Sequence, residues 1–200
     1  MGYSGHGRVL LDAVKSTDLK VEGYFQDKAN QENPFSLKYM GNESDCTDDF
    51  FPNSKFIIGI GDNLIRSKAF KFIKNKKGNI ETVIHSTASI SNLVEIKEGC
   101  FVNTNAIIHI GAEIGNNTII NSGAIVEHDC RIGAHVHIAP GVTLCGNVVV
   151  GDYTFIGAGA TVIEGVNIGS NVTVGAGSVV VRNIPNNVIS VGVPSKIISK

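Results

Sequence analysis

The strongest constraint on the fold is a six-residue period that runs unbroken through the second half of the chain. From Ile84 to Val180 every sixth residue is Ile, Val or Leu, seventeen times in succession. An α-helix cannot keep such a stripe on one face, because six residues turn it through about 600°. A single strand of that length is equally implausible. The period therefore predicts a coil of short strands joined by turns, with the aliphatic side chains filling its axis.

A second position of the repeat carries only small residues. Four residues after each aliphatic from Ile84 to Val174, nothing larger than valine occurs, as the run from Ala88 through Cys100, Ala124 and Cys130 to Ser178 shows. A long loop between coils would have shifted the phase unless it held a multiple of six residues, and no shift is seen.

The pattern resembles the hexapeptide repeat of left-handed parallel β-helices, in which three hexads close one triangular coil of eighteen residues. Seventeen repeats make nearly six coils, and at the spacing of neighbouring strands the prism would be roughly 25–30 Å tall. We expect this domain, with a C-terminal cap, over residues 84–200. Its flat outer faces favour side-by-side association.

Residues 1–83 instead alternate helix and strand, which predicts a small N-terminal α/β domain of the Rossmann-like βαβ type. Strands are expected at 21–25 and 56–60, with a mostly loop-like polar stretch over 28–53. Two helical faces are expected from apolar spacing, one made by Val9, Leu10, Ala13 and Val14, the other by Leu64, Ile65, Phe72 and Ile73.

Composition narrows the class of protein. A net charge of −1 gives no basic field for nucleic acid, and 42% hydrophobic residues describe a soluble globular chain. No run of eighteen apolar residues occurs and the start lacks the features of a signal peptide, so we expect a cytoplasmic protein with no membrane partner. The four cysteines include no CxxC pair, which argues against a zinc knuckle or a disulfide framework.

The most polar stretch of the repeats surrounds His128. It lies two residues after the inward Val126 and has Glu127 and Asp129 on either side. An imidazole with a pKa near 6.5 is suited to accept a proton at neutral pH, and an acidic partner fixes its tautomer. The other histidines of the repeats, His85, His109 and His135, are expected on the outer faces as ordinary polar residues.

This stretch is similar to the bacterial acetyltransferases that modify amino sugars on nucleotide carriers, the bacillosamine and perosamine acetyltransferases, and to the related sialic-acid O-acetyltransferases. The resemblance implies that His128 is the general base and that Asp129 orients it. It also implies that His137 lies at the coenzyme and substrate end of the site, with Asn121 in the same site.

The N-terminal half carries the resemblance independently. The run from Gly2 to Gly7, GYSGHG, resembles the family's Gly-Ala-Ser-Gly-His-Gly loop, and Ile60-Gly61-Asp62-Asn63 with Arg66 resembles a second family turn. A glycine loop that opens a helix presents backbone N–H groups to phosphate. The resemblance thus assigns to the nucleotide sugar the residues Ser4, Gly5, His6, Asp27 and Gly61; a ring at His6 could equally belong to a turn and pack on a substrate base.

The resemblance also assigns residues to the binding of the coenzyme. Positions where the family's pantetheine arm runs are occupied by Gly146, Ala158, Gly175 and Ala176, although tight coils also require small residues there. The ending from Val191 to Lys196 resembles a Gly-Val-Pro-Ala-Lys ending that places Lys196 near the coenzyme.

Three departures from the family affect the N-terminal half. Relatives begin with an apolar strand before the glycine loop, whereas Met1 directly precedes Gly2 here, so either the start is truncated or the sheet lacks a strand. Tyr3 stands where a small residue is usual, and Lys28 follows Asp27 where a second aspartate is common. The last two departures leave open which nucleotide carries the sugar.

The resemblance implies an acetyl-CoA-dependent N-acetyltransferase acting on the amino group of a nucleotide-linked amino sugar in surface-glycan biosynthesis. The expected enzyme is a homotrimer with sites between subunits, direct transfer and no metal. The nearest alternative is O-acetylation of a sugar hydroxyl, such as that of sialic acid. Two others are less favoured: a zinc carbonic anhydrase of this fold would carry two histidines five apart, and a structural β-helix would carry regular Thr or charge ladders.

Overall fold

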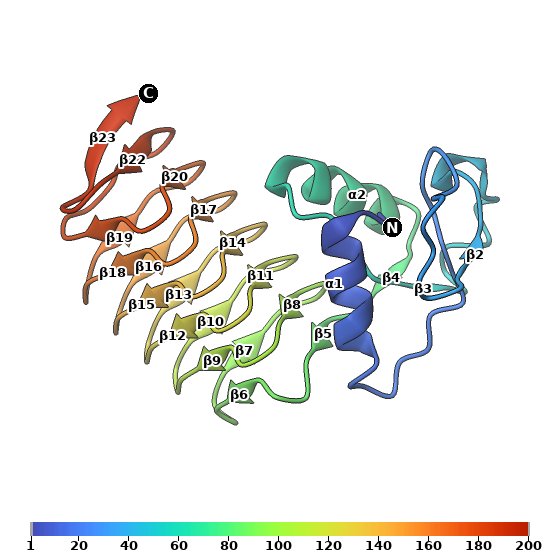
Figure 1. Cartoon of the computed structure of the whole chain (residues 1–200), viewed down its shortest axis with the longest axis horizontal. Helices are drawn as coiled ribbons and strands as arrows, with labels where there is room; N and C mark the ends of the chain where they lie inside the picture. Colours follow the sequence, from blue (N-terminus) through green and yellow to red (C-terminus); the bar gives the residue numbers. More distant parts are fainter. Residues whose placement is uncertain (1, 200) are drawn as a thin grey trace.

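The computed structural model describes residues 2–199 and shows an N-terminal α/β unit lying against one side of a long parallel β-helix (Figure 1). The N-terminal unit contains α1 (Gly5–Val14), β1 (Gly23–Tyr24), β2 (Lys38–Tyr39), the 3-10 helix η1 (Glu43–Asp45), β3 (Lys55–Phe56), α2 (Asn63–Asn75) and β4 (Asn79–Ile80). Strand β1 pairs with β2 and β3 pairs with β4, both in parallel. No helix within residues 2–199 has the length and apolar character needed to cross a bilayer.

The β-helix is built of two-residue strands that recur every six residues. They are β5 (Val83–Ile84), β6 (Ser89–Ile90), β7 (Glu95–Ile96), β8 (Phe101–Val102), β9 (Ile107–Ile108), β10 (Glu113–Ile114), β11 (Ile119–Ile120), β12 (Ile125–Val126), β13 (Arg131–Ile132), β14 (His137–Ile138), β15 (Thr143–Leu144), β16 (Val149–Val150), β17 (Phe155–Ile156), β18 (Thr161–Val162), β19 (Asn167–Ile168), β20 (Thr173–Val174) and β21 (Val179–Val180), followed by β22 (Ile189–Val191) and β23 (Lys196–Ser199). Each strand from β5 to β18 pairs in parallel with the strand eighteen residues further on, as Ile120 with Ile138. Three hexads therefore close one coil, and the predicted β-helix is confirmed.

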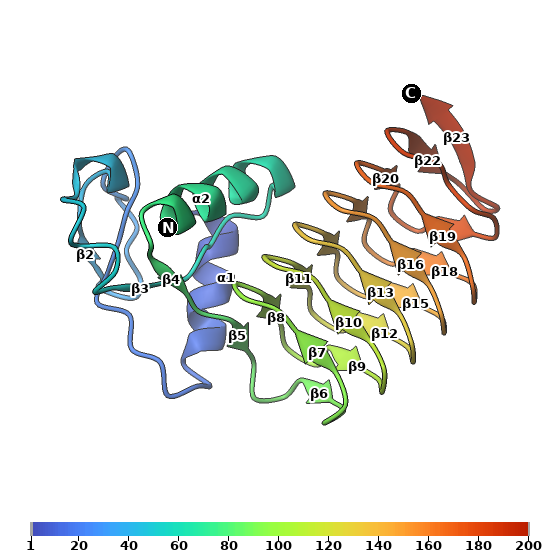
Figure 2. The same ribbon diagram turned by 180° about the vertical axis from the view of Figure 1, so that it is seen from behind.

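The coils form three faces. Face 1 contains β5, β8, β11, β14, β17, β20, β22 and β23, face 2 contains β6, β9, β12, β15, β18 and β21, and face 3 contains β7, β10, β13, β16 and β19. Helices α1 and α2 lie on the side of face 1 (Figures 1 and 2). There Leu10, Ala13 and Val14 of α1 pack on Val83, Phe101 and Ile119.

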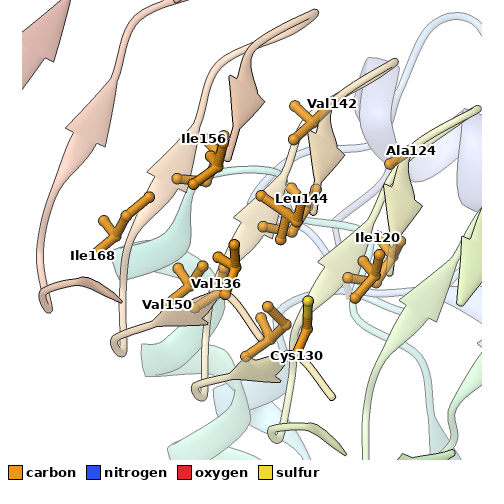
Figure 3. Packing of buried hydrophobic residues seen from close by; sticks show 14 of the residues in the cluster. Ile120, Ala124, Cys130, Val136, Val142, Leu144, Val150, Ile156 and Ile168 are labelled. Carbon is orange, nitrogen blue, oxygen red and sulfur yellow. The ribbon is translucent and has the colours of Figure 1, made fainter. Parts of the chain in front are cut away.

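The predicted axial stack is the core of the β-helix (Figure 3). Ile120, Ile138, Leu144 and Ile156 are completely buried. The first member of the series, Ile84, is 38% exposed, because it lies in the first coil, at the open end of the prism. Burying each such side chain contributes about 1.5–3 kcal/mol, which accounts for the strictness of the period.

Local hydrogen bonds and turns explain the remaining positions of the repeat. At the small position the hydroxyl groups of Thr118 and Thr154 donate to the carbonyls of Gly133 and Gly169, at 2.9 and 2.7 Å. Three residues after each inward aliphatic from Ile96 to Val174, the turn residue has a positive φ, and Gly or Asn fills most of these positions because they tolerate it best. Asp129, at φ 58°, occupies one of them.

One prediction for the N-terminal unit is wrong in detail. The first-turn residues Leu64 and Ile65 of α2 are 57% and 56% exposed, whereas Arg66, Phe70 and Ile73 are buried. The helix packs on the β-helix and on β3–β4 through the face that contains Arg66, and this turns Leu64 and Ile65 outward. The strands are also shorter than expected, and the polar stretch over 28–53 contains β2 and η1.

Candidate active site

His128 lies at the corner between faces 2 and 3, in the turn that joins β12 to β13. Its Nδ1 is 2.9 Å from Oδ2 of Asp129, and the two side chains are 53% and 60% exposed. The carboxylate accepts a hydrogen bond only from an Nδ1–H, so this contact favours the tautomer whose Nε2 carries a free lone pair. The arrangement is that of a general base held by an acidic partner.

Two glycines in neighbouring coils make room for this pair. A Cβ atom built on Gly146, one coil above, would lie 2.5 Å from Nε2 and 2.6 Å from Cε1 of His128. On the coil below, a Cβ on Gly111 would collide with Oδ1 of Asp129. The imidazole therefore rests directly on the backbone of Gly146.

A second polar cluster lies between face 1 and the N-terminal unit. The Nδ1 of His137 is 3.2 Å from the carbonyl oxygen of Gly61, and its Nε2 is 3.0 Å from Nδ2 of Asn121. The ring of His6, in the first turn of α1, lies 5.9 Å from that of His137 and 5.8 Å from that of Phe101. Four of the predicted site residues, His6, Gly61, Asn121 and His137, thus lie together. His6 is in a helix and not in a turn.

The imidazoles of this cluster are held neutral. Burial lowers the pKa of His6 and of His137 to about 4, and the positive charge of Arg66 acts in the same direction. The Nε2 of His6 is buried without a hydrogen-bond partner among residues 2–199. A buried nitrogen of this kind can bind a substrate group.

The prediction that His135 is an exposed polar residue is wrong. It is 7% exposed, and its ring stacks on Tyr153 at 4.9 Å and contacts Phe70 edge-on at 5.5 Å. Helix α2 covers the corner between faces 3 and 1, and this buries the imidazole and lowers its pKa to about 4. The other two histidines assigned to outer faces differ from it, because His109 is exposed and His85 half-buried.

The remaining predicted residues are spread over the chain. Ser4 and Gly5 are exposed at the start of α1, where the Ser4 side chain makes no capping hydrogen bond. Asp27 is exposed after β1 and accepts a hydrogen bond from Asn42 at 3.0 Å. The coenzyme candidates Ala158, Gly175 and Ala176 lie at the corner between faces 1 and 2, and Lys196 begins β23.

One protomer therefore does not assemble the whole predicted site. His128, Asp129 and Gly146 lie at the corner between faces 2 and 3, whereas His6, Asn121 and His137 lie on or beside face 1. A groove of about 380 Å³ between β1 and β3 contains none of the predicted site residues. Across residues 2–199, no three His, Cys, Asp or Glu side chains are grouped in a way that could hold a metal ion.

Sequence reasoning assigned no site role to Arg66, which is 1% exposed and lies between the two parts of the molecule. A signal was present, because Arg66 shares a helical face with Ala69, Phe70 and Ile73. An arginine that shares a helical face with apolar residues is a candidate for a buried, hydrogen-bonded charge.

Comparison with known proteins shows the family to which the chain belongs. The family described as PglD N-terminal domain matches residues 1–73, and the bacterial transferase hexapeptide family (six repeats) matches 111–146 and 147–182. A histidine mutant of the perosamine N-acetyltransferase from Caulobacter crescentus, in complex with CoA and GDP-perosamine, is 33% identical with a TM-score of 0.93, over 100% of this chain and 95% of that one. The chain belongs to this family of hexapeptide-repeat acetyltransferases. The family resemblance inferred from the motifs is confirmed.

Two further solved structures are similar to this chain along nearly its whole length. The acetyltransferase domain of PglB from Neisseria gonorrhoeae FA1090 is 30% identical, with a TM-score of 0.90, over 98% of this chain and 97% of that one. WeeI from Acinetobacter baumannii AYE is 25% identical, with a TM-score of 0.81, over the same shares. No curated protein matches the sequence significantly.

Proposed function

We propose that this acetyltransferase moves the acetyl group of acetyl-CoA to the amino group of a nucleotide-linked amino sugar, as a cytoplasmic homotrimer in surface-glycan biosynthesis. The observation that carries the proposal is the His128–Asp129 pair resting on Gly146, since it supplies a base with an open Nε2. Support comes from the relatives: one was crystallised with CoA and GDP-perosamine, and the PglB domain with acetyl coenzyme A. The relative crystallised with GDP-perosamine is named as an N-acetyltransferase, which favours N-acetylation over O-acetylation.

The chemistry follows from the pair. The sugar nitrogen attacks the thioester carbonyl while Nε2 of His128 takes its proton, so that a C–N bond forms and the C–S bond breaks. The sulfur leaves as coenzyme A and receives that proton. Asp129 stabilises the imidazolium formed on the way.

The charge that develops on the carbonyl oxygen needs a donor. The backbone N–H of Gly146 makes no hydrogen bond to any residue in 2–199, and it belongs to the glycine on which the base rests. We assign to it the role of oxyanion donor.

Association of protomers would complete the site. In a side-by-side trimer, the corner of one prism that carries His128 would face the neighbour's face 1, with His137, Asn121 and the N-terminal unit. Exposed apolar side chains support such contacts, since Ile110, one coil below His128, is 51% exposed and Leu93 is 68% exposed. The nucleotide would then bind at Ser4, Gly5, His6, Asp27 and Gly61, and the coenzyme along Gly146, Ala158, Gly175, Ala176 and Lys196, ending at His137.

Mass spectrometry tests the proposal. Purified protein and acetyl-CoA are incubated with GDP-, UDP-, dTDP- and CMP-linked 4-amino sugars, with their 4-hydroxy counterparts and with free sialic acid. An increase in mass by one acetyl group on an amino sugar, absent from the His128→Ala variant, is the expected result. Acetylation of sialic acid alone would establish the O-acetyltransferase instead.

A further inference from the structure

Arg66 is a buried cation that has only neutral partners. Its guanidinium is 1% exposed, and burial lowers its pKa to about 10, which leaves it charged at neutral pH. A buried charge is tolerated only when its donors are satisfied. All three nitrogens donate, to the carbonyl oxygens of Asn117 (3.0 Å), Ile60 (3.3 Å), Gly61 (2.8 Å), His135 (3.1 Å) and Val136 (3.0 Å) and to Oδ1 of Asn63 (2.8 Å).

These acceptors belong to both parts of the molecule. Ile60, Gly61 and Asn63 are in the N-terminal unit, whereas Asn117, His135 and Val136 are in the β-helix. Only the planar fork of arginine can donate in so many directions from one buried position. Arg66 therefore fixes the position of the Gly61 turn relative to face 1.

The Gly61 carbonyl connects Arg66 to His137. This oxygen accepts from Nη1 of Arg66 and lies 3.2 Å from Nδ1 of His137, so His137 carries its proton on Nδ1. On the other side of the ring, Nε2 accepts from Nδ2 of Asn121 at 3.0 Å. The amide of Asn121 cannot be reversed, because its Oδ1 accepts from the Ser122 N–H at 2.8 Å.

We propose that Arg66 is a positioning residue for acetyl transfer, which fixes the orientation and the tautomer of His137 through the Gly61 carbonyl. The inference rests on the proposed function, in which His137 and His6 border the reacting groups. The cation also disfavours a second positive charge on either ring, so both imidazoles reach the substrate in their neutral form.

The test uses Arg66→Lys, which keeps the charge but cannot make all six hydrogen bonds, and Lys68→Met as a matched control, since Lys68 is exposed on the same helix. Nitrogen-15 NMR of the imidazoles, with His137 assigned by His137→Asn, reports its tautomer and its titration. We expect the Nδ1–H form in the wild type and a mixture of tautomers in Arg66→Lys. The kcat should fall at least about tenfold in Arg66→Lys, with the KM for acetyl-CoA changed less than about threefold, and Lys68→Met should match the wild type.

Two results would overturn the inference. One is an Nε2–H tautomer of His137 in the wild type, which is measurable even if no Arg66 variant folds. The other is an Arg66→Lys protein with a lower melting temperature but the kcat and His137 spectrum of the wild type, which would make Arg66 purely structural. If the wild type acetylates no nucleotide sugar, the proposed function fails, while the NMR measurement still decides the role of Arg66.

Discussion

The contact between Gly146 and His128 allows the base to be displaced without removing it. In Gly146→Ala the new Cβ would lie 2.5 Å from Nε2, and all three of its nearest atoms belong to the His128 ring. An ordinary contact begins near 3.4 Å, so the ring must move by about 1 Å, and a displacement of that size lowers turnover by about 10². Gly146 does not have a positive φ, so alanine itself is tolerated there. Because the half-exposed ring can swing outward, the loss of stability should stay below about 1 kcal/mol.

The assay is kcat at saturating substrates for Gly146→Ala, His128→Ala and the double variant, with melting temperatures as the control for folding. If the alanine acts only through His128, adding it to His128→Ala changes the residual rate no further. Wild-type turnover in Gly146→Ala would refute the geometry. A full loss that persists in the His128→Ala background would instead place the effect at the coenzyme or at the Gly146 N–H.

Three further outcomes follow from the same structure. The His128→Ala variant should lose about 10² to 10⁴ in kcat, and Asp129→Asn should lose less; wild-type turnover in His128→Ala would remove it from the mechanism. Burial lowers the pKa of His135 and His137 to about 4 in the folded protein, whereas both side chains titrate near pH 6.5 in the unfolded chain. The free energy of unfolding should therefore be highest above about pH 6.5 and fall as the pH drops towards 4. Denaturant titrations should show a loss of about 2 kcal/mol per histidine between about pH 7.5 and 5, and a pH-independent free energy of unfolding would contradict this. Ile138→Ala should destabilise the protein by about 2–5 kcal/mol, because Ile138 is fully buried. Leu64→Ala should destabilise it by less than about 0.5 kcal/mol, because Leu64 is 57% exposed. Equal losses would contradict the axial stack.

The β-helix could be predicted well because each coil must bury one aliphatic side chain per hexad. Each hexad therefore carries its own signal for the fold, as at Ile120, Ile138 and their equivalents. It predicted the N-terminal unit less well, since burial there depends on contacts between distant segments. Leu64 and Ile65 have apolar side chains, yet helix α2 packs through Arg66 and Phe70. No local pattern shows that His135 is covered by that helix.

The candidate site could likewise be predicted only in part. The pairing of His128 with Asp129 could be predicted because the two residues are adjacent and the turn brings their side chains together. The contact of Gly61 with His137 joins residues 76 positions apart and depends on how the two parts of the chain dock. The network around Arg66 was missed for that reason, since all but one of its acceptors are backbone carbonyls, which carry no sequence signal.

The central claim, that His128 of one protomer works with His137 and the N-terminal unit of another, is tested most directly by subunit complementation. His128→Ala and His137→Gln proteins, each inactive alone, are unfolded together in equal amounts and refolded. In a cyclic trimer with one site at each interface, about one quarter of the sites would combine an intact His128 with an intact His137. Recovery of about one quarter of the wild-type turnover is the predicted result, and mixed trimers with no activity would show that both histidines act within one protomer.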